Sequence, residues 1–275
     1  MKKQLLTLAV LALAAGTASA QATDTLAKIK DRGAVNLGVR DSSGLAFTLG
    51  GGKYVGFHTE MAERIIDDLG KSLGKPLKIN YQVITSQNRI PLIQNGTIDF
   101  ECGSTTNNKA RQKDVDFAFT TYVEEVRIAV KANSGIKSIK DLNGRTVATT
   151  TGTTSVQTLR KNERAGGIDF KEVMGKDHAD SFLLLESGRA DAFVMDGSIL
   201  AANIAKSKSP KDFAIVGEVL SVEPIACMLP KGDAKLKKAI DDSIVRQIKD
   251  GSLTKLYDKW FMQPIPPNNV TLNMP

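Results

Sequence analysis

Strand-like segments alternate with helix-like segments along most of this chain, and this alternation constrains the fold more than any other sequence feature. Within one helical segment, Met61, Ile65 and Leu69 recur at helical spacing and leave one apolar face. The candidate strands are 35–40, 78–84, 98–102, 122–131, 145–149, 170–173, 190–195, 214–216 and 225–229. Further helices are expected from 86–88 to Gly96, and over 156–164, 180–187 and 198–206. Strands and helices in this order indicate an α/β fold and not an all-α or all-β one.

The valine-rich segment at 122–131 divides this pattern in two. One α/β set precedes it and a second follows, and the strand at 225–229 is placed to return the chain to the first set. If the first twenty residues are removed as a secretory leader, roughly 255 residues remain. That length suits two domains better than one. A helix packed on the core is then predicted by the four-residue spacing of Leu236, Ile240, Ile244 and Ile248. A second short helix is expected through 256–261, before an extended end.

The first twenty residues have the features of a secretory leader. Lys2 and Lys3 precede an apolar run at 5–15, and Ala18-Ser19-Ala20 is a small-residue cleavage site. The apolar run is too short to span a bilayer, and neither cysteine lies at the cut to carry a lipid anchor. We expect cleavage after Ala20 and release into the periplasm of a Gram-negative cell. Loss of the two lysines lowers the net charge from +7 to +5.

Cys102 and Cys227 are the only cysteines in the chain. An exported protein with two cysteines often joins them in a disulfide. Two buried thiols that act as small apolar side chains are the alternative, and the sequence leaves both open.

The sequence lacks the motifs that nucleic-acid binding, nucleotide binding, metal binding and serine hydrolase activity require. No run of basic residues with interleaved aromatics is present, so no nucleic-acid partner is expected. A phosphate loop requires a spacing of glycines and lysine that is absent from the two glycine-containing segments 50–53 and 151–155. The segment 50–53 instead predicts a hairpin turn. The two histidines lack metal-site spacing, and no serine lies in a Gly-x-Ser-x-Gly elbow. We therefore expect no cofactor, no metal and no catalytic residues.

Polar residues gather at strand ends and helix starts, where α/β proteins bind ligands because backbone N–H groups and helix dipoles point there. These places are 40–43, 86–89, 103–106 with Arg111, 151–155, and His178 with Asp196. Each also has a structural interpretation: hydroxyl and amide residues before helices are usually N-caps, arginines can be surface residues, and a histidine can be structural. Taken together, these donors and cations suit carboxylates.

Two segments carry a family resemblance: Ser86 to Gly96 (SQNRIPLIQNG) and Asp99 to Asn108 (DFECGSTTNN). They closely resemble the glutamate/aspartate-binding proteins of amino-acid ABC transporters, which belong to solute-binding protein family 3. The resemblance extends over nearly the whole mature chain, and includes 152–155, 176–178, 185–190, 195–196, 226–229, 258–261 and 264–267.

This resemblance implies a type II periplasmic-binding-protein fold, with two lobes joined by two crossing strands and a ligand bound between them. The first lobe would comprise 21–130 with 226–275, and the second 131–225. The protein would work as a monomer that delivers L-glutamate or L-aspartate to the membrane permease of an ABC transporter.

The resemblance also implies roles for individual residues. Arg111 would hold the ligand α-carboxylate, helped by Thr106 and Thr154. Thr153, next to Thr154, is also expected at the ligand. Asp196 and Ser104 would bind the α-ammonium. The side-chain carboxylate would be surrounded by Arg40, Ser86, Arg89 and His178.

The charges of these residues agree with such a ligand, because an acidic amino acid carries two carboxylates and one ammonium. The implied site offers three arginines, one histidine and one aspartate, and arginine can form two parallel hydrogen bonds to a carboxylate. The sequence does not indicate which acidic amino acid is preferred. A cyclohexadienyl dehydratase-like enzyme on the same scaffold is the alternative, but Asp196 would be its only candidate acid.

Overall fold

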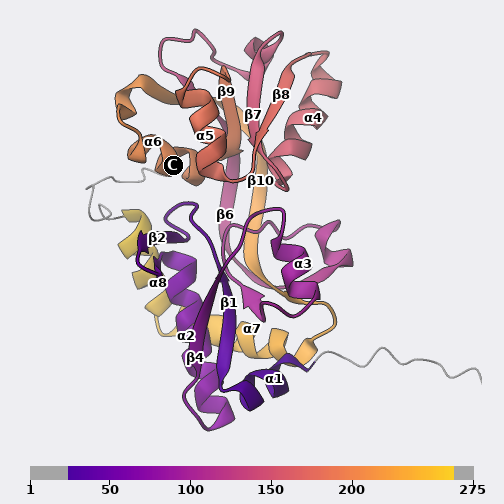
Figure 1. The fold of residues 1–275 in the computed structure, drawn as a ribbon, viewed down its shortest axis with the longest axis vertical. Helices are drawn as coiled ribbons and strands as arrows, with labels where there is room; N and C mark the ends of the chain where they lie inside the picture. Colours follow the sequence, from indigo (N-terminus) through magenta and orange to yellow (C-terminus); the bar gives the residue numbers. More distant parts are fainter. Residues whose placement is uncertain (1–23, 263–275) are drawn as a thin grey trace, which may run out of the picture.

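The computed structural model describes residues 24–262, and Figure 1 shows a molecule of two lobes stacked one above the other. The predicted leader at 1–20 and the predicted extended end after Pro264 lie outside these residues. In the described part of the chain, no helix is both long and apolar enough to cross a membrane.

The first lobe, lower in Figure 1, is built from segments near both ends of the chain. Its helices and strands are α1 (Thr25–Arg32), β1 (Ala34–Val39), β2 (Phe47–Gly50), β3 (Lys53–Val55), α2 (Phe57–Leu73), β4 (Lys78–Val83), α3 (Arg89–Gln94), β5 (Phe100–Glu101), α7 (Ala234–Lys249) and α8 (Ser252–Tyr257). A 3₁₀ turn at Arg111–Lys113 and a π turn at Asp258–Met262 complete it.

The second lobe is formed by the middle of the chain. Its elements are β7 (Thr146–Thr150), α4 (Thr154–Gly166), β8 (Lys171–Gly175), α5 (His178–Glu186), β9 (Ala192–Asp196), α6 (Gly197–Lys206) and 3₁₀ turns at Ile139–Leu142 and Pro210–Asp212. Each lobe has its own apolar core: Ile65 and Phe100 belong to a core of the first, and Val147 and Leu159 to one of the second.

Two long antiparallel strands, β6 (Val115–Lys131) and β10 (Phe213–Pro230), run through both lobes. They are the central pair of one eight-stranded sheet with the order β4-β1-β5-β10-β6-β9-β7-β8. On one side of the pair, β4, β1 and β5 are mutually parallel, and on the other side β9, β7 and β8 are. The predicted α/β fold with two crossing strands is therefore confirmed, while the residue boundaries of the lobes stay a prediction.

The prediction of two separate strands at 214–216 and 225–229 is wrong, because both segments belong to β10. The pairing of β10 with β6 shifts register between Val216 and Ser221, close to Gly217, which has a φ of +78°. This irregularity interrupts the period-two pattern on which a sequence-based assignment depends.

Helix α7 packs on the core of the first lobe through Leu236, Ile240 and Ile244, but Ile248 is 55% exposed. An exact four-residue spacing advances by more than one helical turn, so successive side chains drift around the axis. Three such steps turn Ile248 away from the core, and Gln247 is buried in its place. The prediction that all four residues pack inward is therefore wrong for Ile248.

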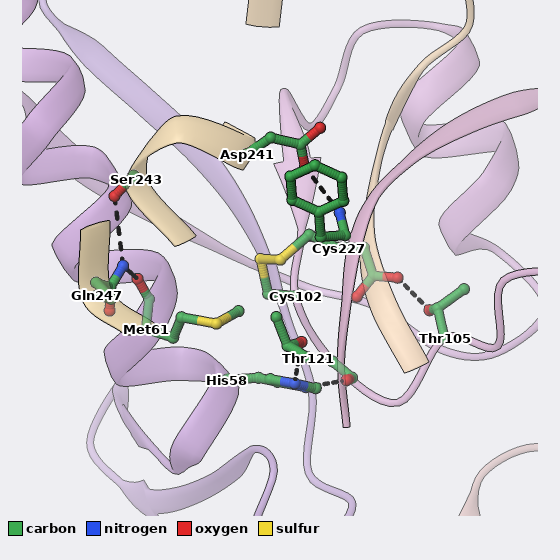
Figure 2. Close-up of a disulfide and its surroundings, with 12 residues drawn as sticks. His58, Met61, Cys102, Thr105, Thr121, Cys227, Asp241, Ser243 and Gln247 are labelled. Atoms are coloured by element: carbon green, nitrogen blue, oxygen red, sulfur yellow. Dashed lines mark hydrogen bonds between the residues drawn. A yellow bond between two sulfur atoms is a disulfide. The ribbon is translucent and has the colours of Figure 1, made fainter. Parts of the chain in front are cut away.

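Cys102 and Cys227 form a disulfide, which decides between the two possibilities that the sequence left open. Cys102 follows β5 and Cys227 lies on the neighbouring strand β10, at a sequence separation of 125. Figure 2 shows the bridge in the first lobe, with His58 below it. The bridge therefore closes a loop that contains the whole second lobe.

Candidate functional site

The predicted site residues come from strand ends that face each other across the two lobes. In the first lobe, Arg40 follows β1, and the loop 102–106 follows β5. In the second lobe, 151–155 follows β7, His178 follows β8, and Asp196 ends β9. The strands within each of these sets are parallel, so their carboxyl ends meet at one edge of the sheet. We call the region where the two edges meet the interlobe site.

Arg40 connects the two lobes at one end of the interlobe site. Its Nη1 donates to Ser86 Oγ at 2.9 Å, and its Nη2 lies 2.6 Å from His178 Nε2. Burial, followed by the charges of Arg40 and Arg89, lowers the pKa of His178 well below its usual value. A neutral His178 can accept from Arg40 through Nε2 while its Nδ1 donates to Thr150 Oγ1 at 3.2 Å.

Arg89 lies buried at the start of α3 and is held by a chain of two hydrogen bonds. Its Nη1 donates to Thr105 Oγ1, and that hydroxyl donates to the carboxylate of Glu101. Burial lowers the pKa of Arg89, and the carboxylate of Glu101 offsets part of this change. Burial, followed by the charge of Arg89, also lowers the pKa of Arg40, to about 10. Arginine side chains keep their charge in proteins, so both groups supply positive charge to the site.

Arg111 makes a second connection between the lobes. Its Nη1 donates to the Thr106 carbonyl oxygen at 2.9 Å, and its Nη2 donates to the Gly152 carbonyl oxygen at 3.2 Å. Thr106 Oγ1 lies 3.3 Å from Thr154 Oγ1, at the start of α4. Burial, followed by the charge of Arg89, lowers the pKa of Arg111 to about 9. The charge of Arg89 thus acts on both Arg40 and Arg111, which places Arg89 near each of the other two arginines.

Asp196 lies at the start of α6, with only 2% of its surface exposed. Its Oδ1 has no hydrogen-bond partner within residues 24–262. Burial raises the pKa of Asp196 well above its usual value, and the nearby carboxylates of Glu124 and Glu223 raise it further. A cationic partner placed beside this buried carboxyl group would stabilise its ionised form and lower its pKa.

Ser104 and Thr153 are the remaining predicted site residues, and both are buried. Ser104 lies in the loop after β5. The Thr153 hydroxyl donates to the Thr150 carbonyl oxygen at 2.8 Å, within its own turn, which leaves only its oxygen lone pairs for another partner.

The lobes touch at further points around this site. Ser198 Oγ lies 3.3 Å from Ser43 Oγ, and Lys206 Nζ lies 3.0 Å from Asp41 Oδ1. Gly152 has a φ of +80°, and a Cβ added there would lie 2.8 Å from backbone atoms of Ser86 and Gln87. The structure is thus a closed arrangement, in which the turn after β7 lies against the loop before α3.

Three further residues at the interlobe site are absent from the sequence prediction: Glu101, Glu124 and Glu223. Thr105 lies within the predicted polar segment 103–106, but the sequence prediction assigned it no individual role. Glu101 lies inside the most specific motif, so that motif marked it without showing its contacts. Glu124 and Glu223 are register partners on β6 and β10, and only the pairing of these strands brings them together. The charge balance drawn from sequence is incomplete, because it leaves out Glu101 and includes a histidine that is neutral here.

Among the described residues, no group of histidine, cysteine, aspartate and glutamate side chains could hold a metal ion. The interlobe site instead combines three guanidinium groups, a neutral imidazole, hydroxyl groups and buried carboxyl groups. This combination can bind and orient anions together with a cation.

Comparisons with known proteins agree with this geometry. The profile of the family described as bacterial extracellular solute-binding proteins, family 3, matches residues 35–263. The L-glutamate/L-aspartate-binding protein of Pseudomonas aeruginosa is 43% identical over 267 residues, which cover 96% of this chain and 88% of that protein. The glutamate/aspartate import solute-binding protein of Escherichia coli K12 is 43% identical, and the match covers 96% of this chain and 91% of that protein. An ancestral arginine-binding protein solved with arginine is 31% identical and has a TM-score of 0.75, over 84% of this chain and 99% of that chain.

Proposed function

This chain belongs to the bacterial extracellular solute-binding proteins of family 3, and from that membership we propose that it captures L-glutamate or L-aspartate between its lobes. The observation that supports this most is the convergence of buried Arg40, Arg89 and Asp196 with the partly buried Arg111 in one region. The names of the relatives at 43% identity also favour an import receptor over a dehydratase-like enzyme.

The ligand α-carboxylate is proposed to lie against Arg111 at the start of α4. The Arg111 guanidinium, the Thr106 and Thr154 hydroxyl groups and the α4 N-terminus are close together there. Guanidinium donors and helix N-termini both favour a carboxylate. Thr153, in the same turn, is assigned to this end of the ligand. The α-ammonium would bind the carboxyl group of Asp196, with help from Ser104.

The side-chain carboxylate is proposed to lie at the other end, among Arg40, Ser86, Arg89 and His178. Nε of Arg40 and Nε of Arg89 are buried and have no hydrogen-bond partner within residues 24–262. A neutral glutamine amide would leave a buried guanidinium partly unpaired, at a cost of roughly 1.5 to 3 kcal/mol. Acidic ligands would therefore bind about one to two decades more tightly than glutamine.

The cross-lobe contacts suggest how the receptor delivers its ligand. Arg40 with His178 and Arg111 with Gly152 would form when the lobes close, with bending in β6 and β10. The closed form would be recognised by the permease of an ABC transporter. We further propose a periplasmic monomer that loses its leader after Ala20, with lobe 1 at 21–130 and 226–275 and lobe 2 at 131–225.

Isothermal titration calorimetry of the mature protein against the twenty amino acids tests the proposal. Glutamate or aspartate should bind at least tenfold more tightly than every neutral or basic amino acid. If neither acidic amino acid binds, or if glutamine or arginine binds more tightly, the proposed function is wrong. Release of phenylpyruvate or phenylalanine from prephenate or arogenate would instead support the enzyme alternative.

A further inference from the structure

The buried carboxylate of Glu101 is the charged group beside Arg40 and Arg89 to which no role has been assigned. Glu101 ends the short strand β5 and has no exposed surface. One carboxylate oxygen accepts from Thr105, which itself accepts from Arg89, while Oε2 has no hydrogen-bond partner within residues 24–262. Burying a carboxylate is costly, so a carboxylate kept in this position needs a compensating charge.

Two glycines make room for the Glu101 side chain, and one of them, Gly103, also borders Arg40. A Cβ added at Gly38 would lie 2.8 Å from Glu101 Cβ, and one added at Gly103 would lie 2.9 Å from Glu101 Oε2. The same Gly103 position lies 3.4 Å from Arg40 Cδ, so the absence of a side chain there lets Glu101 and Arg40 approach each other. The charge of Glu101 favours the cationic form of both Arg40 and Arg89, and Thr105 relays a hydrogen bond from Arg89 to it, so the Glu101 carboxylate is a counter-ion near both arginines.

The charges at this end of the site can now be counted. Arg40 and Arg89 supply two positive charges, Glu101 supplies one negative charge, and His178 is neutral. Asp177 and Asp196 act on Arg40 less strongly than Glu101 does, and Asp196 is matched by the ligand ammonium in the proposed function. One excess positive charge remains, which a single carboxylate neutralises. A dianionic group would leave a buried negative charge without a partner, which is unfavourable.

On the basis of the proposed function, we propose that Glu101 is a specificity-determining residue that limits the side-chain end of the site to one negative charge. Carboxylate and sulfonate side chains satisfy this limit. Phosphonate and phosphate side chains in their dianionic form exceed it. Glu101 acts through Arg40 and Arg89 and does not itself need to touch the ligand.

The sulfonate and phosphonate analogues of glutamate test this limit, because their tetrahedral groups have similar shape but carry one and two charges. Calorimetry is done above the second ionisation of the phosphonate. Wild-type protein should bind the sulfonate at least tenfold more tightly than the phosphonate, and Glu101→Gln should shift that ratio toward the phosphonate at least tenfold, about 1.4 kcal/mol. The preference for glutamate over glutamine should also rise at least tenfold in Glu101→Gln.

Two variants control for effects other than charge at this position. Glu101→Asp keeps the charge and should keep both ratios near the wild-type values. Asp99→Asn removes a buried carboxylate from the same segment, where it bonds Arg32 and the Asn36 N–H outside the site, and should also leave the ratios unchanged.

Each outcome decides the inference. Equal binding of both analogues by wild-type protein, or ratios that Glu101→Gln leaves unchanged or moves the other way, would overturn it. If the tetrahedral analogues do not bind, the glutamate-to-glutamine ratio alone decides, and if Glu101→Gln does not fold, the wild-type ratio decides. Wild-type protein that binds neither acidic amino acid would refute the proposed function, a result distinct from failure of this inference.

Discussion

Substitution of Gly152 by alanine should weaken ligand binding by opposing closure of the lobes. Gly152 lies in the turn after β7, and an added Cβ would lie 2.8 Å from the N and Cα atoms of Gln87 and from the carbonyl carbon of Ser86. Non-bonded carbon atoms prefer separations of about 3.5 to 4.0 Å, and neither backbone segment is a flexible side-chain end that could move aside. The turn must therefore withdraw from the first lobe.

The magnitude follows from two separate costs. The positive φ of +80° costs alanine about 1 to 2 kcal/mol, but this cost applies whether the lobes are open or closed. The steric cost applies only when the lobes are closed, and overpacking of this kind costs about 1 to 3 kcal/mol. Withdrawal also lengthens the hydrogen bond from Arg111 to the Gly152 carbonyl oxygen. The dissociation constant for glutamate or aspartate should therefore rise by about 5-fold to 150-fold.

Gly167 offers a matched control in the same lobe. It has a φ of +61°, and an added Cβ there would meet no atom within 4 Å, so Gly167→Ala pays the conformational cost without the clash. Calorimetry should show weakened binding for Gly152→Ala and wild-type affinity for Gly167→Ala, and both should lose similar thermal stability. Equal ligand affinity in the two variants would refute the closure argument.

Three further predictions concern single groups. Arg111→Ala should weaken binding of both acidic amino acids by about 2 to 5 kcal/mol, because it removes a charged partner from a buried pair; unchanged affinity in calorimetry would refute the α-carboxylate assignment. Replacing both Cys102 and Cys227 by serine should lower the free energy of unfolding by up to about 5 kcal/mol, from the chain entropy of a loop with a sequence separation of 125; a loss below about 1 kcal/mol in urea unfolding would contradict this. Burial lowers the pKa of His58 from 6.5 to about 4, so the unfolded chain takes up a proton first as the pH falls, and roughly 3 kcal/mol of stability is lost between these two values. Urea unfolding of His58→Gln should lack this part of the pH dependence, and an identical pH profile would show that another group is responsible.

Burial keeps His58 neutral, and its two hydrogen-bond contacts are compatible with a neutral ring. Its Nδ1 lies 2.6 Å from the Gly103 carbonyl oxygen, and its Nε2 lies 2.8 Å from Thr121 Oγ1. A neutral ring can donate through Nδ1 and accept through Nε2. Figure 2 marks the contact between His58 and Thr121 with a dashed line. A doubly protonated ring would lose the second bond unless the hydroxyl rotated.

The sequence determined the order of helices and strands because that order depends on neighbours a few residues apart. Apolar spacing predicted α2 from Met61, Ile65 and Leu69, and the structure ends this helix at Gly74, which has a φ of +73°. The same local logic did not detect α1, where buried apolar residues are too few to define a face, or the continuity of β10 past its irregular register.

The site was predicted residue by residue only through a family resemblance, because no local pattern distinguishes a binding arginine from a surface one. What the tertiary structure decided is which distant groups meet. Arg40 meets His178 from 138 residues away, Cys102 joins Cys227, and Arg89 reaches the carboxylate of Glu101 through the hydroxyl of Thr105. Hydrogen bonds and charge interactions depend on separation in space, and chain separation fixes that distance only within a helix, strand or turn. The residue types of the interlobe site therefore followed from the sequence, whereas the pairing of these residues and the net charge of the site followed from the fold.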